Sequence, residues 1–256
     1  MDKRLDRIRR YRLIDNSFMK VFFKDNPEAV ELVLQIILGR TDIRVLSSSV
    51  EYNLDNMEGR SVILDVHAED ESGIEFDVEI QRRSQGAGPE RAGYHLSLMH
   101  THMLTKNESF DKLNDAYVIF ITETDCLGNG KPISVFETMD IDDHKQFKDK
   151  RHIIYVNGAA RCGTTEIGRL MEDFFCTDPD KINYPQLRER FKYLKESNKG
   201  VNEMMTIEEE IILEGKIEIA LNLIRQNRIT YKEIADVTGL SLEKVTELAE
   251  AESKAG

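Results

Sequence analysis

Apolar and polar residues alternate most regularly in residues 61–81, where the pattern predicts a β-hairpin. The first arm, residues 62–66, is apolar except for Asp65, and such a run is typical of a strand buried on both faces. The second arm, residues 74–81, has apolar side chains at every even position. Its odd positions hold Glu75, Asp77, Glu79 and Gln81. A charge inside a buried strand requires a partner, so Asp65 needs an explanation.

The geometry of the hairpin places Asp65 opposite Glu79. If Glu71-Ser72-Gly73 is a three-residue loop with its glycine in the left-handed conformation, Asp70 pairs with Ile74. In that register Asp65 directly faces Glu79, on the same side of the sheet. Directly paired Cβ atoms lie about 5 Å apart, and two bare carboxylates at that distance repel each other.

A hard divalent cation between Asp65 and Glu79 would remove this repulsion. The simpler interpretation of Glu75, Asp77 and Glu79 is a solvated strand face, and the residues alone leave both interpretations open. His67 alternates onto the face of Asp65, and we interpret it as a hydrogen-bonded strand histidine. His95, His100 and His102 do not share one helical face, which argues against a zinc site.

Periodicity predicts the elements around the hairpin. Helical patterns precede it, and a further helix, with Leu96, Met99 and Met103 on its buried face, follows it. The predicted helices before residue 160 cover about 15–24, 28–38 and 90–104, and the predicted strands outside the hairpin cover about 43–54, 116–123, 133–138 and 152–156. Beyond residue 160 the pattern is helical throughout, with helices predicted at 165–175, 185–195 and 203–226. The chain then forms two further predicted helices, joined by a turn at Gly239, and Ser241 caps the second of them.

Several segments, together with their order along the chain, resemble the Rpn-type recombination-promoting nuclease and transposase family of the PD-(D/E)XK nuclease superfamily. Asp65, the hairpin and Glu79-Ile80-Gln81 resemble its signature. The segment D15-N-S-F-M-K-V-F-F23 resembles its first helix, P89-E-R-A-G-Y-H-L-S-L-M99 its Arg-x-x-Tyr helix, and L113-N-D-A-Y-V-I-F-I-T-E123 its next strand. The similarity covers most of the first 160 residues.

This resemblance implies an α/β fold with a restriction-endonuclease-like core, a mixed sheet between helices, followed by a C-terminal all-helical segment. We divide the chain into a nuclease-like core (1–160), a helical extension of the core (161–200) and an acidic helical tail (201–256).

The resemblance also implies roles for individual residues. Asp65, Glu79 and the Ile80 carbonyl would bind Mg²⁺ or Mn²⁺. Gln81 stands where many relatives have Lys, and unlike Lys it carries no charge. Asp15 matches an acidic residue of that family that reaches the metal through water. The sequence around Asp15, taken alone, favours a helix N-cap instead. Arg91 and Tyr94, one helical turn apart, would face the scissile phosphate, although packing on the sheet is the simpler role for Tyr94.

Composition adds limits to this prediction. The chain of 256 residues has no apolar run long enough for a transmembrane helix, and its three cysteines lack C-x-x-C spacing, so we expect a cytoplasmic protein without a membrane partner. The net charge of −12 argues against a simple nucleic-acid binder. Basic residues nevertheless gather in two places: Arg4, Arg7, Arg9, Arg10 and Arg12 near the start, and Arg82, Arg83 and Arg91 near the candidate site.

The final two helices have the spacing of a helix-turn-helix, but the second presents Glu243, Glu247 and Glu250 against Lys244 alone. Phosphates would repel that helix, so we predict a packing or oligomerisation bundle and a possible homodimer through the tail.

The leading hypothesis is a metal-dependent DNA endonuclease, with DNA as its partner, associated with recombination or transposition. The alternative is a non-catalytic binding or assembly protein on a degenerate nuclease scaffold, which the missing Lys and the acidic surface favour.

Overall fold

The structure is a computed structural model that describes residues 3–56, 59–83 and 86–255. The chain divides into two compact units, residues 1–201 and 202–256. In the first unit a six-stranded mixed sheet has the strand order β1-β2-β3-β4-β6-β5. The strands are β1 (Val45–Leu54), β2 (Val62–Asp70), β3 (Glu75–Gln81), β4 (Ala116–Thr122), β5 (Ile133–Phe136) and β6 (Arg151–Asn157).

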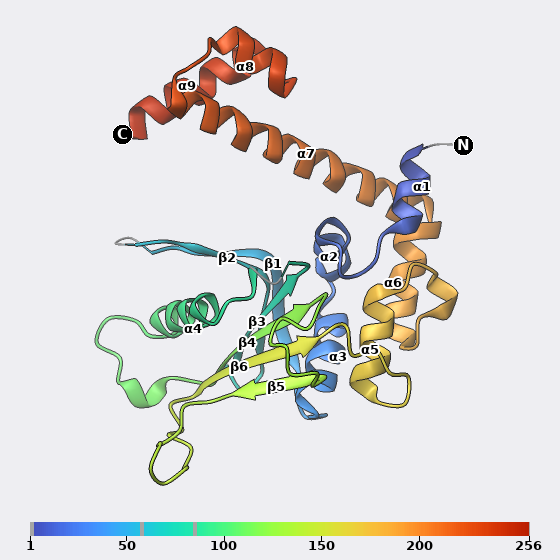
Figure 1. Cartoon of the computed structure of the whole chain (residues 1–256), viewed down its shortest axis with the longest axis vertical. Helices are drawn as coiled ribbons and strands as arrows, with labels where there is room; N and C mark the ends of the chain where they lie inside the picture. Colours follow the sequence, from blue (N-terminus) through green and yellow to red (C-terminus); the bar gives the residue numbers. More distant parts are fainter. Residues whose placement is uncertain (1–2, 57–58, 84–85, 256) are drawn as a thin grey trace. The chain divides into compact units, whose positions relative to one another are not determined.

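Helices flank this sheet (Figure 1). The helices of the first unit are α1 (Lys3–Arg10), α2 (Asn16–Phe23), α3 (Pro27–Leu38), α4 (Pro89–Met103), α5 (Glu166–Phe175) and α6 (Pro185–Glu196), with 3₁₀ turns η2 (Phe110–Lys112) and η3 (Pro179–Lys181). β3 and β4 pair in parallel, which requires a crossover connection, and α4 provides it. The predicted fold class is confirmed, and α1 is a helix that the sequence pattern did not predict.

The hairpin between β2 and β3 has the predicted register. The Asp70 N–H donates to the Ile74 carbonyl at 3.0 Å, and Gly73 has a φ of 75°, the left-handed conformation that the three-residue loop requires. Val66 pairs with Val78, and the next pair joins His67 to Asp77.

β2 differs from the prediction in its burial. The strand is buried on one face only: Val62 and Leu64 are buried, whereas Ile63 between them is 57% exposed. The even-numbered residues from Val62 to Asp70 are buried, and the odd-numbered residues between them are partly or fully exposed. The prediction of a strand buried on both faces was therefore wrong.

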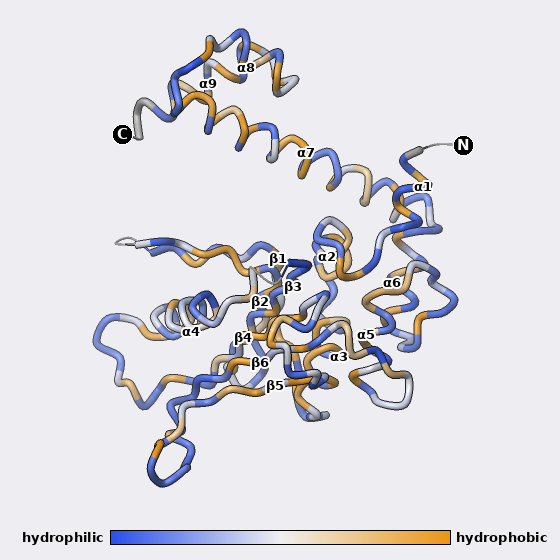
Figure 2. The backbone as a smooth tube through the Cα atoms, in the orientation of Figure 1, coloured by the Kyte–Doolittle hydropathy of each residue, from blue (hydrophilic) through white to orange (hydrophobic). Residues whose placement is uncertain are grey.

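The core of the first unit lies on both sides of the sheet. Leu96 and Met99 of α4 are buried together with Val118 and Phe120 of β4, as the helix pattern predicted. In another part of the core, the Phe191 ring of α6 lies 5.1 Å, between centroids, from the rings of Phe18 and Phe22 of α2. Figure 2 shows the apolar character of the central strands against the mostly polar loop that joins β5 to β6.

The second unit contains most of α7 (Asn198–Gln226), followed by α8 (Tyr231–Thr238) and α9 (Leu242–Ala255). Its small core joins Ala220, Ile234 and Val245, one from each helix. Thr230 forms a capping box with Glu233 at the start of α8, and Gly239 ends this helix in the left-handed conformation. The Ser241 hydroxyl accepts from the Lys244 N–H at 3.1 Å, so the predicted helix, turn, cap and helix are confirmed.

Among the residues that the structure describes, no helix is long and apolar enough to cross a membrane.

Candidate active site

Asp65 and Glu79 lie where β2 and β3 separate, just beyond the Val66–Val78 pair. The Asp65 N–H donates to Glu79 Oε1 at 3.1 Å, and the Ile80 N–H donates to Asp65 Oδ2 at 2.9 Å. Each carboxylate therefore satisfies a main-chain N–H of the opposite strand in place of a carbonyl. The two side chains converge at one position of the sheet, as the hairpin register predicted.

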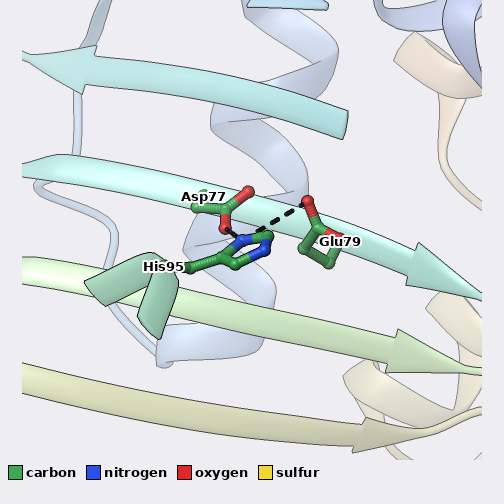
Figure 3. A group of neighbouring side chains, drawn as sticks. All are labelled: Asp77, Glu79 and His95. Carbon is green, nitrogen blue, oxygen red and sulfur yellow. Dashed lines mark hydrogen bonds and ion pairs between the residues drawn. The ribbon is translucent and has the colours of Figure 1, made fainter. Parts of the chain in front are cut away.

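α4 covers the odd-numbered side chains of β3. His95 Nδ1 lies 2.9 Å from Asp77 Oδ2 and 3.8 Å from Glu79 Oε1 (Figure 3), and Arg91 Nη2 donates to Glu79 Oε2 at 2.5 Å. Asp77 and Glu79 are completely buried. The interpretation of these two residues as part of a solvated strand face was therefore wrong, because the alternation along β3 does not reveal that a helix packs over the acidic face.

The carboxylates of Asp65, Asp77 and Glu79 thus lie close together, largely shielded from water and with little positive charge nearby. Burial, together with the charges of Asp77 and Asp65, raises the pKa of Glu79 to about 8 against the opposing effect of Arg91. Burial also raises the pKa of Asp65 and holds that of Asp77 well above its usual range. The three groups cannot all be ionised at neutral pH without additional positive charge.

His95 is held as a neutral imidazole between an arginine and a carboxylate. Arg91 Nε donates to His95 Nε2 at 3.2 Å, so the ring proton belongs on Nδ1, from which it is donated to Asp77. Burial lowers the pKa of His95, which agrees with the neutral form. A chain of contacts therefore runs from Asp77 through His95 and Arg91 to Glu79.

The donor set fits a divalent cation. Ligand atoms of Asp77, Glu79 and His95 lie within 4.8 Å of one another. The two carboxylates are the candidate cation ligands of this group, because both nitrogens of His95 are engaged by Arg91 and Asp77. Asp77 Oδ1 is buried and has no hydrogen-bond partner among the described residues, although a buried carboxylate oxygen normally has one. Carboxylate oxygens are the ligands that Mg²⁺ and Mn²⁺ prefer, and a bound cation would supply the missing positive charge.

Two cavities adjoin these residues. One, of about 440 Å³, is lined by Asp65, Ile80 and Gln81 together with Ile14, Asn16, Arg82, Arg83 and Gly86. The other, of about 600 Å³, is lined by Arg91, Tyr94 and His95 together with Arg60, Ser61, Val62, Ile63 and Glu90. Arg91 connects them, because it lines the larger cavity while its Nη1 donates to the Gly86 carbonyl at 3.4 Å.

Gln81 contacts one of the carboxylates, whereas Tyr94 contacts the connection between β1 and β2. Gln81 Nε2 donates to Glu79 Oε2 at 3.3 Å, which places the amide in the cavity beside Asp65. The Tyr94 hydroxyl donates to the Arg60 carbonyl at 2.5 Å, and its side chain is 39% exposed. Tyr94 therefore reaches the connection between β1 and β2 instead of packing on the sheet.

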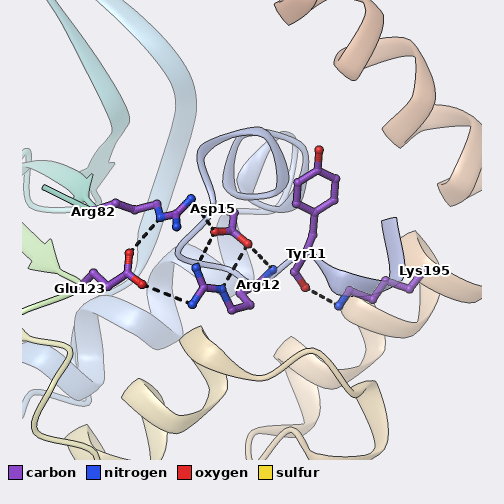
Figure 4. Close-up of polar contacts among 6 residues, drawn as sticks. All are labelled: Tyr11, Arg12, Asp15, Arg82, Glu123 and Lys195. Atoms are coloured by element: carbon purple, nitrogen blue, oxygen red, sulfur yellow. Dashed lines mark hydrogen bonds and ion pairs between the residues drawn. The ribbon is translucent and has the colours of Figure 1, made fainter. Parts of the chain in front are cut away.

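Asp15 occupies the N-cap position of α2, but its side chain makes no capping bond. Its Oδ2 accepts from the Arg12 N–H at 2.9 Å, its Oδ1 accepts from Arg12 Nη2 at 2.9 Å, and Arg82 Nη1 lies 3.2 Å from the same Oδ1 (Figure 4). The N-cap prediction is thus right in position and wrong in contact, because two arginines bind the carboxylate. The predicted water-mediated contact with a metal stays a prediction.

Other residues near Asp65 were not predicted. Lys20 forms an ion pair with Glu51, and its charge opposes the rise in the pKa of Asp65. The β1–β2 register puts Glu51 opposite Asp65, and Glu51 has a φ of 53°, which is uncommon for a non-glycine residue and recurs at functional sites. His67, by contrast, is hydrogen-bonded as predicted, with Nε2 3.2 Å from Glu75 Oε2.

Asp77 and His95 are the site residues that the sequence interpretation missed. The signal that would have found His95 is its spacing from Arg91, since residues four apart on a helix lie on one face. Its separation from His102 was predicted correctly: His102 Nε2 lies 2.8 Å from the Asp55 carbonyl.

A mixed sheet with flanking helices, carrying an acidic cluster at the point where its hairpin opens, defines a protein of the PD-(D/E)XK nuclease class. A comparison with known protein families matches residues 12–232 to the PD-(D/E)XK nuclease family transposases, and the chain belongs to that family. Neither the curated proteins nor the solved structures gave a match.

Proposed function

We propose that the protein is a Mg²⁺-dependent DNA endonuclease that hydrolyses phosphodiester bonds during DNA recombination or transposition. The observation that carries this proposal is the convergence of Asp65 and Glu79, whose carboxylates lie beside Gln81 at a cavity of about 440 Å³.

Asp65, Glu79 and the Ile80 carbonyl are the proposed ligands, because Asp65 and Ile80 line a cavity and Glu79 accepts from the Asp65 N–H, whereas Asp77 lines neither cavity and both His95 nitrogens are engaged. A divalent cation bound there would polarise the phosphodiester and lower the pKa of a water molecule. Gln81 orients the attacking water through its amide. Asp77 and His95 act as positioning residues that hold Arg91 and Glu79 in place.

Arg91 supplies the positive charge that Gln81 lacks. Its guanidinium contacts Glu79, and it lines the larger cavity together with Tyr94. A planar guanidinium binds phosphate through two parallel hydrogen bonds. Arg91 therefore exchanges Glu79 for the scissile phosphate when the substrate enters, and Tyr94 borders the same path.

The test is conversion of supercoiled plasmid to nicked or linear DNA with Mg²⁺, Mn²⁺, Ca²⁺ or chelator. We expect conversion with Mg²⁺ and Mn²⁺ only, and its loss in Asp65→Asn. Glu75→Gln, on the same sheet but in contact with His67, is the control that retains activity. Equal cutting by Asp65→Asn and the control would assign the activity to a contaminant.

The second candidate is a binding or assembly protein without catalysis. Two observations favour it: Gln81 carries no charge, and Arg91 occupies Glu79 Oε2. In that case purified protein would bind DNA without converting the plasmid in any metal.

A further inference from the structure

α1 is an arginine-rich helix fixed to the first unit by an unusual buried lysine. Lys195 of α6 is only 5% exposed, and its Nζ donates to the carbonyls of Arg9 at 3.2 Å, Tyr11 at 2.5 Å and Thr177 at 2.8 Å. Ile8 is completely buried and anchors the same helix. An ammonium group at the last carbonyls of a helix stabilises that end, so α1 has a defined place in the fold.

The fixed helix borders a cavity that adjoins the candidate active site. This cavity, of about 490 Å³, is lined by residues that include Arg7, Arg10, Arg12, Asp15, Asn16 and Arg82. Asn16 and Arg82 also line the cavity that contains Asp65. The two cavities therefore form one continuous surface from α1 to the carboxylates, which we call the α1 groove.

The α1 groove is basic although the chain carries a net charge of −12. Arg12 and Arg82 bridge to Asp15 and Glu123, so these four charges balance within a fixed network (Figure 4). The excess positive charge of the groove comes from the exposed residues Arg10 and Arg83. A run of arginines beside a phosphodiester-cleaving site is the electrostatic arrangement that nucleic-acid backbones require.

We propose that the α1 groove binds the phosphate backbone of duplex DNA and leads it to Asp65 and Glu79. This inference rests on the proposed function and adds the surface that holds the substrate. Arg10 at the end of α1 and Arg83, two residues after β3, contact the backbone outside the scissile phosphate. The Asp15 network holds Arg82 at the junction between backbone binding and cleavage.

The test is the binding of a short fluorescein-labelled duplex by the full chain, followed by anisotropy, with Ca²⁺ in place of Mg²⁺. We expect Arg10→Gln/Arg83→Gln to weaken binding by on the order of tenfold or more at about 0.1 M salt, and to lower the slope of log affinity against log salt by roughly two. Arg40→Gln/Arg44→Gln removes the same charge from residues that line neither cavity of the groove, and it should bind like wild type.

Binding and cleavage fail separately in this design. Equal affinity of the two double variants, or no binding of duplex by wild type, would overturn the α1 groove. A selective loss with Arg10→Gln/Arg83→Gln in a protein that never nicks plasmid would retain the groove and reject the nuclease.

Discussion

Glu79 determines how the site responds to pH. Its pKa in the folded protein is about 8, above the ordinary 4.5, so the folded state binds more protons between these values. The stability that this proton contributes is present below about pH 4.5 and is lost as the pH rises through about 8. The pKa values of Asp65 and Asp77 are raised as well, so the ionisation of these two carboxylates adds to the same loss of stability with rising pH.

We therefore predict that the metal-free protein becomes less stable by a few kcal/mol between about pH 5 and pH 8. Mg²⁺ or Ca²⁺ should restore the free energy of unfolding most strongly at the upper end of this range. Urea unfolding of wild type and Glu79→Gln at several pH values, with and without cation, measures both effects. A wild-type stability that rises with pH as steeply as that of Glu79→Gln would contradict the assigned direction.

Gln81 offers a second residue-scale test. Gln81→Lys places a cation beside Glu79 and the attacking water, so we expect plasmid nicking to be retained or accelerated. The added charge also opposes Glu79 protonation and should raise the pH at which the metal-free protein is most stable. A folded Gln81→Lys protein without any nicking, beside an active wild type, would show that the amide has a role other than orienting water.

At the scale of elements, the β2–β3 hairpin sets the position of the carboxylates. Gly73 has a φ of 75°, and a Cβ added there would lie 2.5 Å from Asn114 Nδ2. Gly39 has a similar φ of 61° with nothing within 4 Å of such a Cβ. Both glycines thus have a left-handed backbone, but only at Gly73 would an added Cβ meet a neighbouring atom.

We predict that Gly73→Ala costs more stability than Gly39→Ala, for which the φ effect alone is about 1 kcal/mol. The excess should lower nicking as well, because displacement of the loop shifts Asp65 against Glu79. Thermal unfolding and plasmid nicking of both variants test this. Equal losses in the two would mean that Asn114 moves away without affecting the hairpin.

The hairpin also shows what the sequence reveals. Its register could be predicted because strict alternation, a left-handed glycine and the loop length are all local signals. The pairing of Asp77 with His95 was not predictable in the same way, because it depends on how α4 docks on the sheet. The arginine contacts of Asp15 arise for the same reason: Arg82 comes from the other end of the hairpin and competes with the cap.

At the scale of the whole molecule, the second unit exposes apolar side chains on α7: Ile212 is 49%, Leu213 47% and Ile219 53% exposed. The small core of this unit does not cover them, and exposed apolar patches mark interaction sites. The homodimer predicted through the tail remains a prediction on this basis.

We predict that Ile212→Asp lowers the molar mass of the full chain in light scattering while Mg²⁺-dependent nicking survives. Glu214→Gln, on the same helix, is the control that leaves the mass unchanged. An identical mass for wild type and Ile212→Asp at every concentration would exclude α7 as the dimer contact.

The central claim is that Asp65 and Glu79 bind the catalytic cation together. Calorimetric titration of Mn²⁺ into metal-free wild type, Asp65→Asn, Glu79→Gln and the control Glu75→Gln tests it without relying on cleavage. We predict one shared loss: both site variants bind Mn²⁺ at least about tenfold more weakly, a difference of about 1.4 kcal/mol, while the control matches wild type. Wild-type affinity in Asp65→Asn would place the cation elsewhere and contradict the account.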